Sequence, residues 1–90
     1  MDLINSEKDK EELKAIVNKY RIGHSKYKWN DGLIRFNRNY KIFLICFTKN
    51  SIFFTVHNDH NLGIAFVSDI LYSLTDFDNL IFYYIQKFHR

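Results

Sequence analysis

Residues 26–37 read KYKWNDGLIRFN, and they decide the fold because polar and apolar residues alternate on both sides of a turn signal. The signal is Asp31-Gly32, a pair that favours the two-residue loops of β-hairpins. If this pair forms the loop, Lys28 lies opposite Arg35 on one face of the hairpin, and the aromatic side chains face the other way. The stretch therefore predicts a hairpin with one apolar face and one basic face.

A second hairpin is predicted after the first. Residues 37–39 form a polar turn, residues 40–48 a nearly continuous apolar strand, and residues 52–57 another strand beyond the turn at 49–50. One face of this hairpin joins the core, and the reverse face is a candidate partner interface. Three large apolar residues mark that reverse face: Ile42, Leu44 and Phe53. Because such a face is too apolar to remain in water, we expect a helix or a partner to cover it, one alternative being a homodimer.

The segment before the hairpins is predicted to be a helix over residues 6–22. Ser6 and Asp9 have the spacing of a capping box, acidic residues crowd the first turns, and bases lie in the last turn. Apolar residues recur at helical spacing from Leu13 to Tyr20 and form one narrow stripe.

The segment after the hairpins allows two interpretations. Residues 64–67 could form a short strand or begin a helix, and residues 80–85 are β-branched and aromatic enough for a strand. The three-four spacing of apolar residues favours two helices, over roughly 64–74 and 76–88. The sequence thus predicts a single α+β domain over residues 1–90, with an N-terminal helix, an antiparallel sheet of three to four strands, and one or two C-terminal helices.

Charge is distributed unevenly along the chain. Residues 19–49 contain eight Lys and Arg against one Asp, a net +7, whereas residues 1–18 and 50–90 each carry −2. A basic segment of this strength favours an anionic partner, which could be RNA, DNA or an acidic protein surface. The candidate anion-binding residues are Lys19, Arg21, Lys26, Lys28, Arg35, Arg38 and Lys41. Since the hairpin aromatics are expected to pack inward, the surface suits charge recognition better than base reading.

No catalytic, metal or cofactor site is predicted. His57, Asp59 and His60 have metal-ligand side chains, but no further ligand lies at a recognisable spacing. Cys46 and His57 would lie about 13 Å apart along the paired strands, which is too far for a nucleophile and its base. With three glycines and no phosphate-binding loop, the chain is expected to be non-enzymatic.

Composition also predicts where the protein works. No apolar run reaches the roughly 18 residues of a membrane span, so no membrane association is expected. The single cysteine, Cys46, suits a reducing compartment, and the charged start of the chain lacks the pattern of a secretory signal. We therefore expect a cytoplasmic location, in a bacterial or host cell.

The predicted order of a helix, three or four antiparallel strands and a helix resembles the topology of the double-stranded RNA-binding domain. That family begins its last helix with a Lys-Lys-x-Ala-Lys type of run, whereas residues 62–67 here read LGIAFV. The resemblance therefore implies a fold, and no binding residues are carried over from it.

Two functions fit these observations. The first is a non-catalytic module that binds nucleic acid through the basic hairpin face, with RNA ahead of DNA because no helix rich in bases is present to enter a groove. The second is a small inhibitor or adaptor, of the kind that phages and mobile elements encode, docking on a host protein such as a defence nuclease. The small size and the apolar reverse face favour this alternative.

Overall fold

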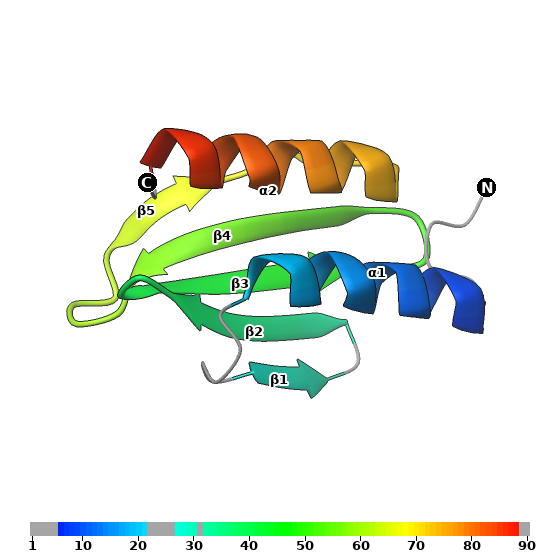
Figure 1. The fold of residues 1–90 in the computed structure, drawn as a ribbon, viewed down its shortest axis with the longest axis horizontal. Coiled ribbons are helices and arrows are strands. Elements are labelled where there is room, and N and C mark those ends of the chain that lie inside the picture. The colour runs from blue at the N-terminus through cyan, green and yellow to red at the C-terminus, as the bar shows by residue number, and fades with distance from the viewer. Residues whose placement is uncertain (1–5, 22–26, 31, 89–90) are drawn as a thin grey trace.

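The computed structural model describes residues 6–21, 27–30 and 32–88 of the chain. Its elements are α1 (Glu7–Tyr20), β1 (Tyr27–Asn30), β2 (Leu33–Arg38), β3 (Lys41–Phe47), β4 (Ile52–Asn58), β5 (Ile64–Val67) and α2 (Leu74–Phe88). The strands form one antiparallel sheet in chain order, from β1 at one edge to β5 at the other (Figure 1). The predicted α+β class, with one helix before the sheet and one after it, is confirmed.

Both hairpins have the predicted register. Lys28 lies opposite Arg35 across β1 and β2, and Ile42 lies opposite His57 across β3 and β4. The backbone of Gly32 has a φ of +79°, a left-handed conformation that glycine adopts without the steric cost of a Cβ. The second position of the first hairpin loop therefore requires glycine, as the turn signal indicates.

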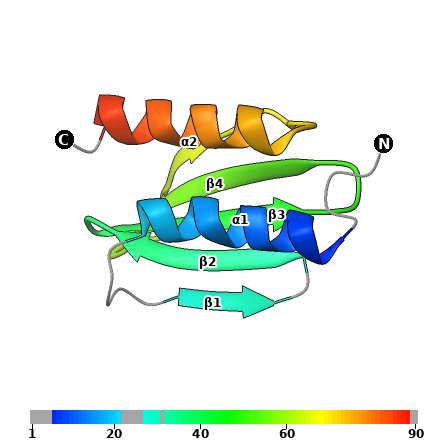
Figure 2. The same ribbon diagram turned by 45° about the vertical axis from the view of Figure 1, so that its right-hand side comes forward.

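Both helices cover the same face of the sheet and leave the other face uncovered by any described element (Figures 1 and 2). Alternation along the strands explains this division, because successive side chains point to opposite faces. One set of positions in β2, β3 and β4 meets the helices and is apolar except at one end of the sheet, where it consists of Arg38, Lys41 and Asn58. The opposite set is mixed, and we call it the open face.

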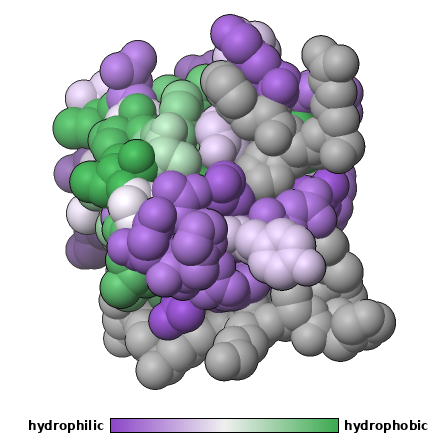
Figure 3. Space-filling model, turned by 90° about the vertical axis from the view of Figure 1, so that its left-hand side faces the viewer, coloured by the Kyte–Doolittle hydropathy of each residue, from purple (hydrophilic) through white to green (hydrophobic). Residues whose placement is uncertain are grey.

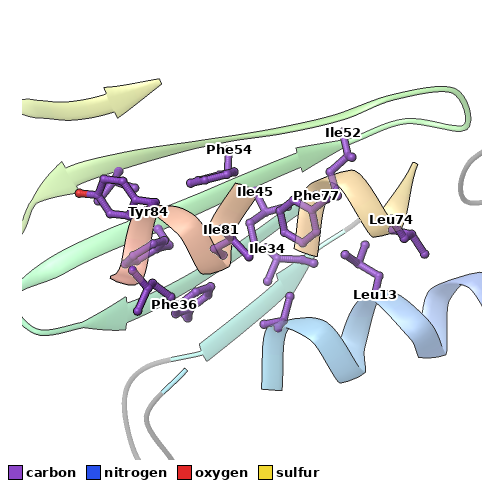
Figure 4. Packing of buried hydrophobic residues seen from close by; sticks show 14 residues of the cluster. Leu13, Ile34, Phe36, Ile45, Ile52, Phe54, Leu74, Phe77, Ile81 and Tyr84 are labelled. Atoms are coloured by element: carbon purple, nitrogen blue, oxygen red, sulfur yellow. The ribbon is translucent and has the colours of Figure 1, made fainter. Parts of the chain in front are cut away.

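The core lies between the helices and the sheet (Figure 4). Phe54 of β4 is completely buried, and the rings of Phe43, Phe66, Phe77 and Tyr84 have their centroids 5.4–6.5 Å from its own. Two of these contacts are edge-to-face, an arrangement worth about 0.5–1.5 kcal/mol per pair beyond the area buried. The apolar stripe of α1 packs against the same core.

Side-chain caps fix where both helices begin. In α1, Ser6 and Asp9 form the predicted capping box, in which the side chain of each residue accepts a hydrogen bond from the backbone N–H of the other. Both hydrogen bonds have a length of 3.2 Å. In α2, Ser73 Oγ accepts a hydrogen bond of 3.0 Å from the Asp76 backbone N–H. This cap explains why α2 begins at Leu74, ahead of its predicted start.

The turn between β2 and β3 is predicted over residues 37–39, but in the structure it consists of residues 39 and 40. Strand β2 continues through Arg38, and the turn is made by Asn39 and Tyr40, whose φ angles are +49° and +63°. Two successive left-handed residues match the twist of the flanking strands, as in a type I′ turn. Arg38 and Lys41 therefore face each other across the end of the sheet.

The region after β4 differs most from the prediction. The expected helix over residues 64–74 is wrong, because Ile64–Val67 pairs with β4 as β5 and Leu71 forms a further bridge with Ile52. An extended segment satisfies the backbone groups along the free edge of β4, which a helix would leave without partners. The sheet therefore has five strands, one more than the predicted maximum.

Candidate nucleic-acid interface

The open face of the sheet consists of three rows of positions that run across the strands. The first row is Asn30, Leu33, Cys46 and Phe53; the second is Lys28, Arg35, Leu44, Thr55 and Val67; the third is Asn37, Ile42, His57 and Ile64. Neighbouring strands lie about 4.8 Å apart, so adjacent positions within a row are neighbours in space. None of these positions carries an acid, but Asp59, in the loop after β4, accepts a hydrogen bond of 3.4 Å from the Asn37 side chain at the end of the third row.

The basic end of this face lies on β1 and β2. The Arg35 side chain is exposed, and it has no hydrogen-bond or ion-pair partner within the part of the chain that the structure describes. Lys28 occupies the register position directly opposite. Like charges placed opposite one another destabilise a strand pair by roughly 0.2–1 kcal/mol. An anion bound here would remove that repulsion.

The apolar part of the face is continuous with its basic end. Leu44 is the next residue after Arg35 in the second row and is half-buried, as is Phe53 in the first row. Ile42, in the third row, is only 5% exposed. Figure 3 shows hydrophobic side chains gathered toward the left of that view, with hydrophilic side chains among them. The structure thus places Arg35, Leu44 and Phe53 on one accessible surface, whereas Ile42 occupies the same side of the sheet but is buried there.

Two predicted cations lie on the helix side of the molecule. Lys19 makes an ion pair of 2.7 Å with Asp78, which ties the end of α1 to α2. Arg21, the C-cap of α1, donates a hydrogen bond of 2.8 Å from Nε to the Asn18 side chain. Neither residue belongs to the rows of the open face.

Two more predicted cations lie at the end of the sheet and are bonded there. Arg38 donates a hydrogen bond of 2.7 Å to the backbone carbonyl of Tyr20, the last residue of α1. Lys41 donates one of 2.6 Å to the Asn58 side chain on β4. By strand alternation both residues point to the helix side, opposite to Arg35. Lys26, the remaining predicted residue, lies outside the described residues.

Asp78 is a partly buried carboxyl that lies within hydrogen-bond distance of Lys19 and Tyr20. Burial alone would raise the pKa of Asp78, but hydrogen bonds from Lys19 and Tyr20 outweigh burial and hold it below its usual value. The bond to the Asp78 carboxylate raises the pKa of Lys19. This cluster fastens α1 to α2, and it withdraws Lys19 from the charge available to a partner.

The cluster predicts a loss of stability in acid. Because the folded pKa of Asp78 lies below its unfolded value of about 3.8, the carboxylate stabilises the fold above that value and stops doing so as the pH falls through the folded pKa. We therefore expect Asp78→Asn to be less stable than the wild type near neutral pH, with a difference that shrinks toward about pH 2. Urea unfolding midpoints at the two pH values measure this. Equal differences at both would contradict the proposed role.

The observed strand register agrees with the predicted separation between Cys46 and His57. The two residues occupy different rows, and His57 Nε2 lies 2.9 Å from Thr55 Oγ1, with which it shares a hydrogen bond. Burial raises the pKa of the half-buried Cys46 thiol, which favours the uncharged form. Within residues 6–21, 27–30 and 32–88, no group of three His, Cys, Asp or Glu side chains is placed to hold a metal ion.

Sequence reasoning missed the extent of the open face. Val67 and Ile64 extend the second and third rows onto β5, and this follows only when residues 64–67 form a strand. A short strand is one of the two interpretations of residues 64–67. The sequence favours the helical interpretation because the apolar residues from this segment onward have helical spacing.

Comparisons of the chain with protein-family models, with curated proteins and with solved structures gave no match. None of the described helices has both the length and the apolar character needed to cross a membrane.

Proposed function

We propose that the chain is a non-catalytic nucleic-acid-binding module that binds single-stranded RNA on the open face of its sheet. One observation carries the proposal: Arg35 is exposed and has no partner among the described residues, in a row of the sheet that contains no acid. Arginine in this setting suits phosphate oxygens, which accept its N–H groups in pairs.

The arrangement of the face suggests how a strand of RNA would lie. Arg35, together with Lys28 at the opposite register position, would hold phosphates at the β1–β2 end. Leu44 and the ring of Phe53 offer apolar surface one and two strands further on, against which bases could pack. Because an open sheet is broad and shallow, it suits splayed single strands better than a duplex.

The salt dependence of binding tests this function. A fluorescently labelled single-stranded RNA of mixed sequence should bind at low salt and weaken as salt rises. For single strands the slope of log affinity against log salt is about −0.7 per neutralised phosphate, so contacts from Lys28 and Arg35 predict a slope of about −1.4. An absence of binding at low salt would refute the proposal, and a single-stranded DNA of the same sequence tests the preference for RNA.

A second candidate function is favoured by the apolar part of the same face. Leu44 and Phe53 lie half-buried beside Arg35, a combination that would also suit a protein with an acidic rim around an apolar patch. A small inhibitor or adaptor encoded by a phage or mobile element, docking on a host protein such as a defence nuclease, would use it in this way. Protein partners that survive nuclease treatment in a pull-down would favour this candidate, whereas partners lost on that treatment favour RNA.

A further inference from the structure

The edge of the sheet at β5 adjoins the open face, which Val67 and Ile64 extend, but its chemistry differs from that of the β1–β2 end. Eight large hydrophobic side chains are exposed among the described residues, and five of these lie on β5 or in the segments that flank it. The five are Leu62, Ile64, Val67, Ile70 and Tyr72, each between 57% and 72% exposed. Exposed apolar residues gathered in one short segment are characteristic of an interaction surface.

The same edge presents backbone groups that no described strand pairs. The Ser68 N–H donates a hydrogen bond of 2.9 Å to the Phe54 carbonyl, so strand alternation directs the N–H and C=O of Val67 away from β4. Beyond β5 the chain stays beside β4, because Ile52 and Leu71 exchange two backbone hydrogen bonds of 2.8 and 2.9 Å. The exposed edge therefore runs past the four residues of β5 itself.

The edge strand β5 is short and its pairing with β4 contains a register shift, but the edge lacks lysine and proline guards. Sheet edges in monomeric proteins are commonly guarded by lysine or proline, which discourage pairing with another chain. Residues 62–72 contain neither type, and Asp69 is their single charged residue. The opposite edge differs, because β1 carries Lys28 at the position facing Arg35.

We propose that the partner of this edge is a second copy of the chain, paired β5 to β5 about a two-fold axis. Antiparallel strand pairing about such an axis is self-complementary, because each copy presents the same row of donors, acceptors and apolar side chains to the other. The near-neutral β5 edges can meet with little repulsion, whereas two β1 edges would bring Lys28 and Arg35 of both copies together. The two sheets would then form one antiparallel sheet with the basic ends farthest apart.

This inference does not depend on nucleic-acid binding, and its test is the mass of the protein in solution. Sedimentation equilibrium of the full chain, over a range of concentrations and without nucleic acid, should show a species of twice the monomer mass of 10.9 kDa. A monomer at every concentration up to about millimolar would overturn the proposal. A mass that grows past twice the monomer mass as the concentration rises would also overturn it, because it would indicate head-to-tail association.

A single substitution on β5 tests whether the dimer forms through this edge. Val67→Lys places the usual guard residue at an exposed position, so it should weaken dimerisation at least about tenfold and leave the circular dichroism spectrum unchanged. Tyr83→Lys is the matched control, since Tyr83 is 54% exposed on α2. A dimer that survives Val67→Lys, or that Tyr83→Lys breaks equally, would contradict pairing through β5.

Discussion

Phe54→Ala is expected to destabilise the fold by about 3–5 kcal/mol, as large-to-small substitutions of buried aromatic residues do. Phe54 is completely buried on β4, and its ring contacts those of residues on β3, β5 and α2. The substitution therefore removes packing between the sheet and the helix layer. Because the free energy of unfolding of a small domain is only about 5–15 kcal/mol, this substitution would remove a large part of the stability. Urea unfolding followed by circular dichroism measures the change.

The neighbouring residue provides a matched control. Phe53 has the same side chain but faces the open side of the sheet and is half-buried. Phe53→Ala should therefore destabilise the fold much less than Phe54→Ala, because the change removes less buried surface and leaves no closed cavity. Equal losses for the two variants would mean that both faces of the sheet are covered, which the described structure does not show.

Arg35→Glu is expected to weaken the binding of single-stranded RNA at least about tenfold at low salt. The change replaces an exposed cation with an anion in a row that otherwise contains no acid, at the register position opposite Lys28. It should also reduce the magnitude of the slope of log affinity against log salt by about 0.7, the value for one phosphate on a single strand. Fluorescence anisotropy with the same labelled RNA at several salt concentrations gives both quantities.

Lys87→Glu is the control for this charge reversal. Lys87 is exposed near the end of α2, in the helix layer, and the substitution changes the net charge by the same amount. RNA affinity should therefore fall only slightly, through the change in overall charge. If the two variants lost affinity equally, binding would depend on net charge alone and the open face would have no special role.

The sequence was sufficient to predict the parts of the fold that depend on local pattern. The Asp31-Gly32 turn set the register of the first hairpin, and with it the position of Lys28 opposite Arg35. The capping box at Ser6 fixed the start of α1. These features need only neighbouring residues, so a single sequence contains them.

The features that the sequence did not predict depend on contacts between segments that are distant in the chain. Residues 64–67 have apolar spacing that suits a helix, but the free edge of β4 makes them a strand. Likewise, the pattern of charges could not show that Lys19 would meet Asp78, because that pair forms only when α1 and α2 pack side by side. The basic segment is therefore continuous in the sequence and divided in space between the open face, the helix layer and the end of the sheet.

The most direct test of the proposed function is to locate bound RNA by nuclear magnetic resonance. On addition of single-stranded RNA, the Arg35 side-chain N–H and the methyl groups of Leu44 should shift, because both lie in the middle row of the open face. The methyl groups of Ile16 and Leu80, in the helix layer, should change little. Shifts confined to the helix layer, with Arg35 and Leu44 unchanged, would contradict the account.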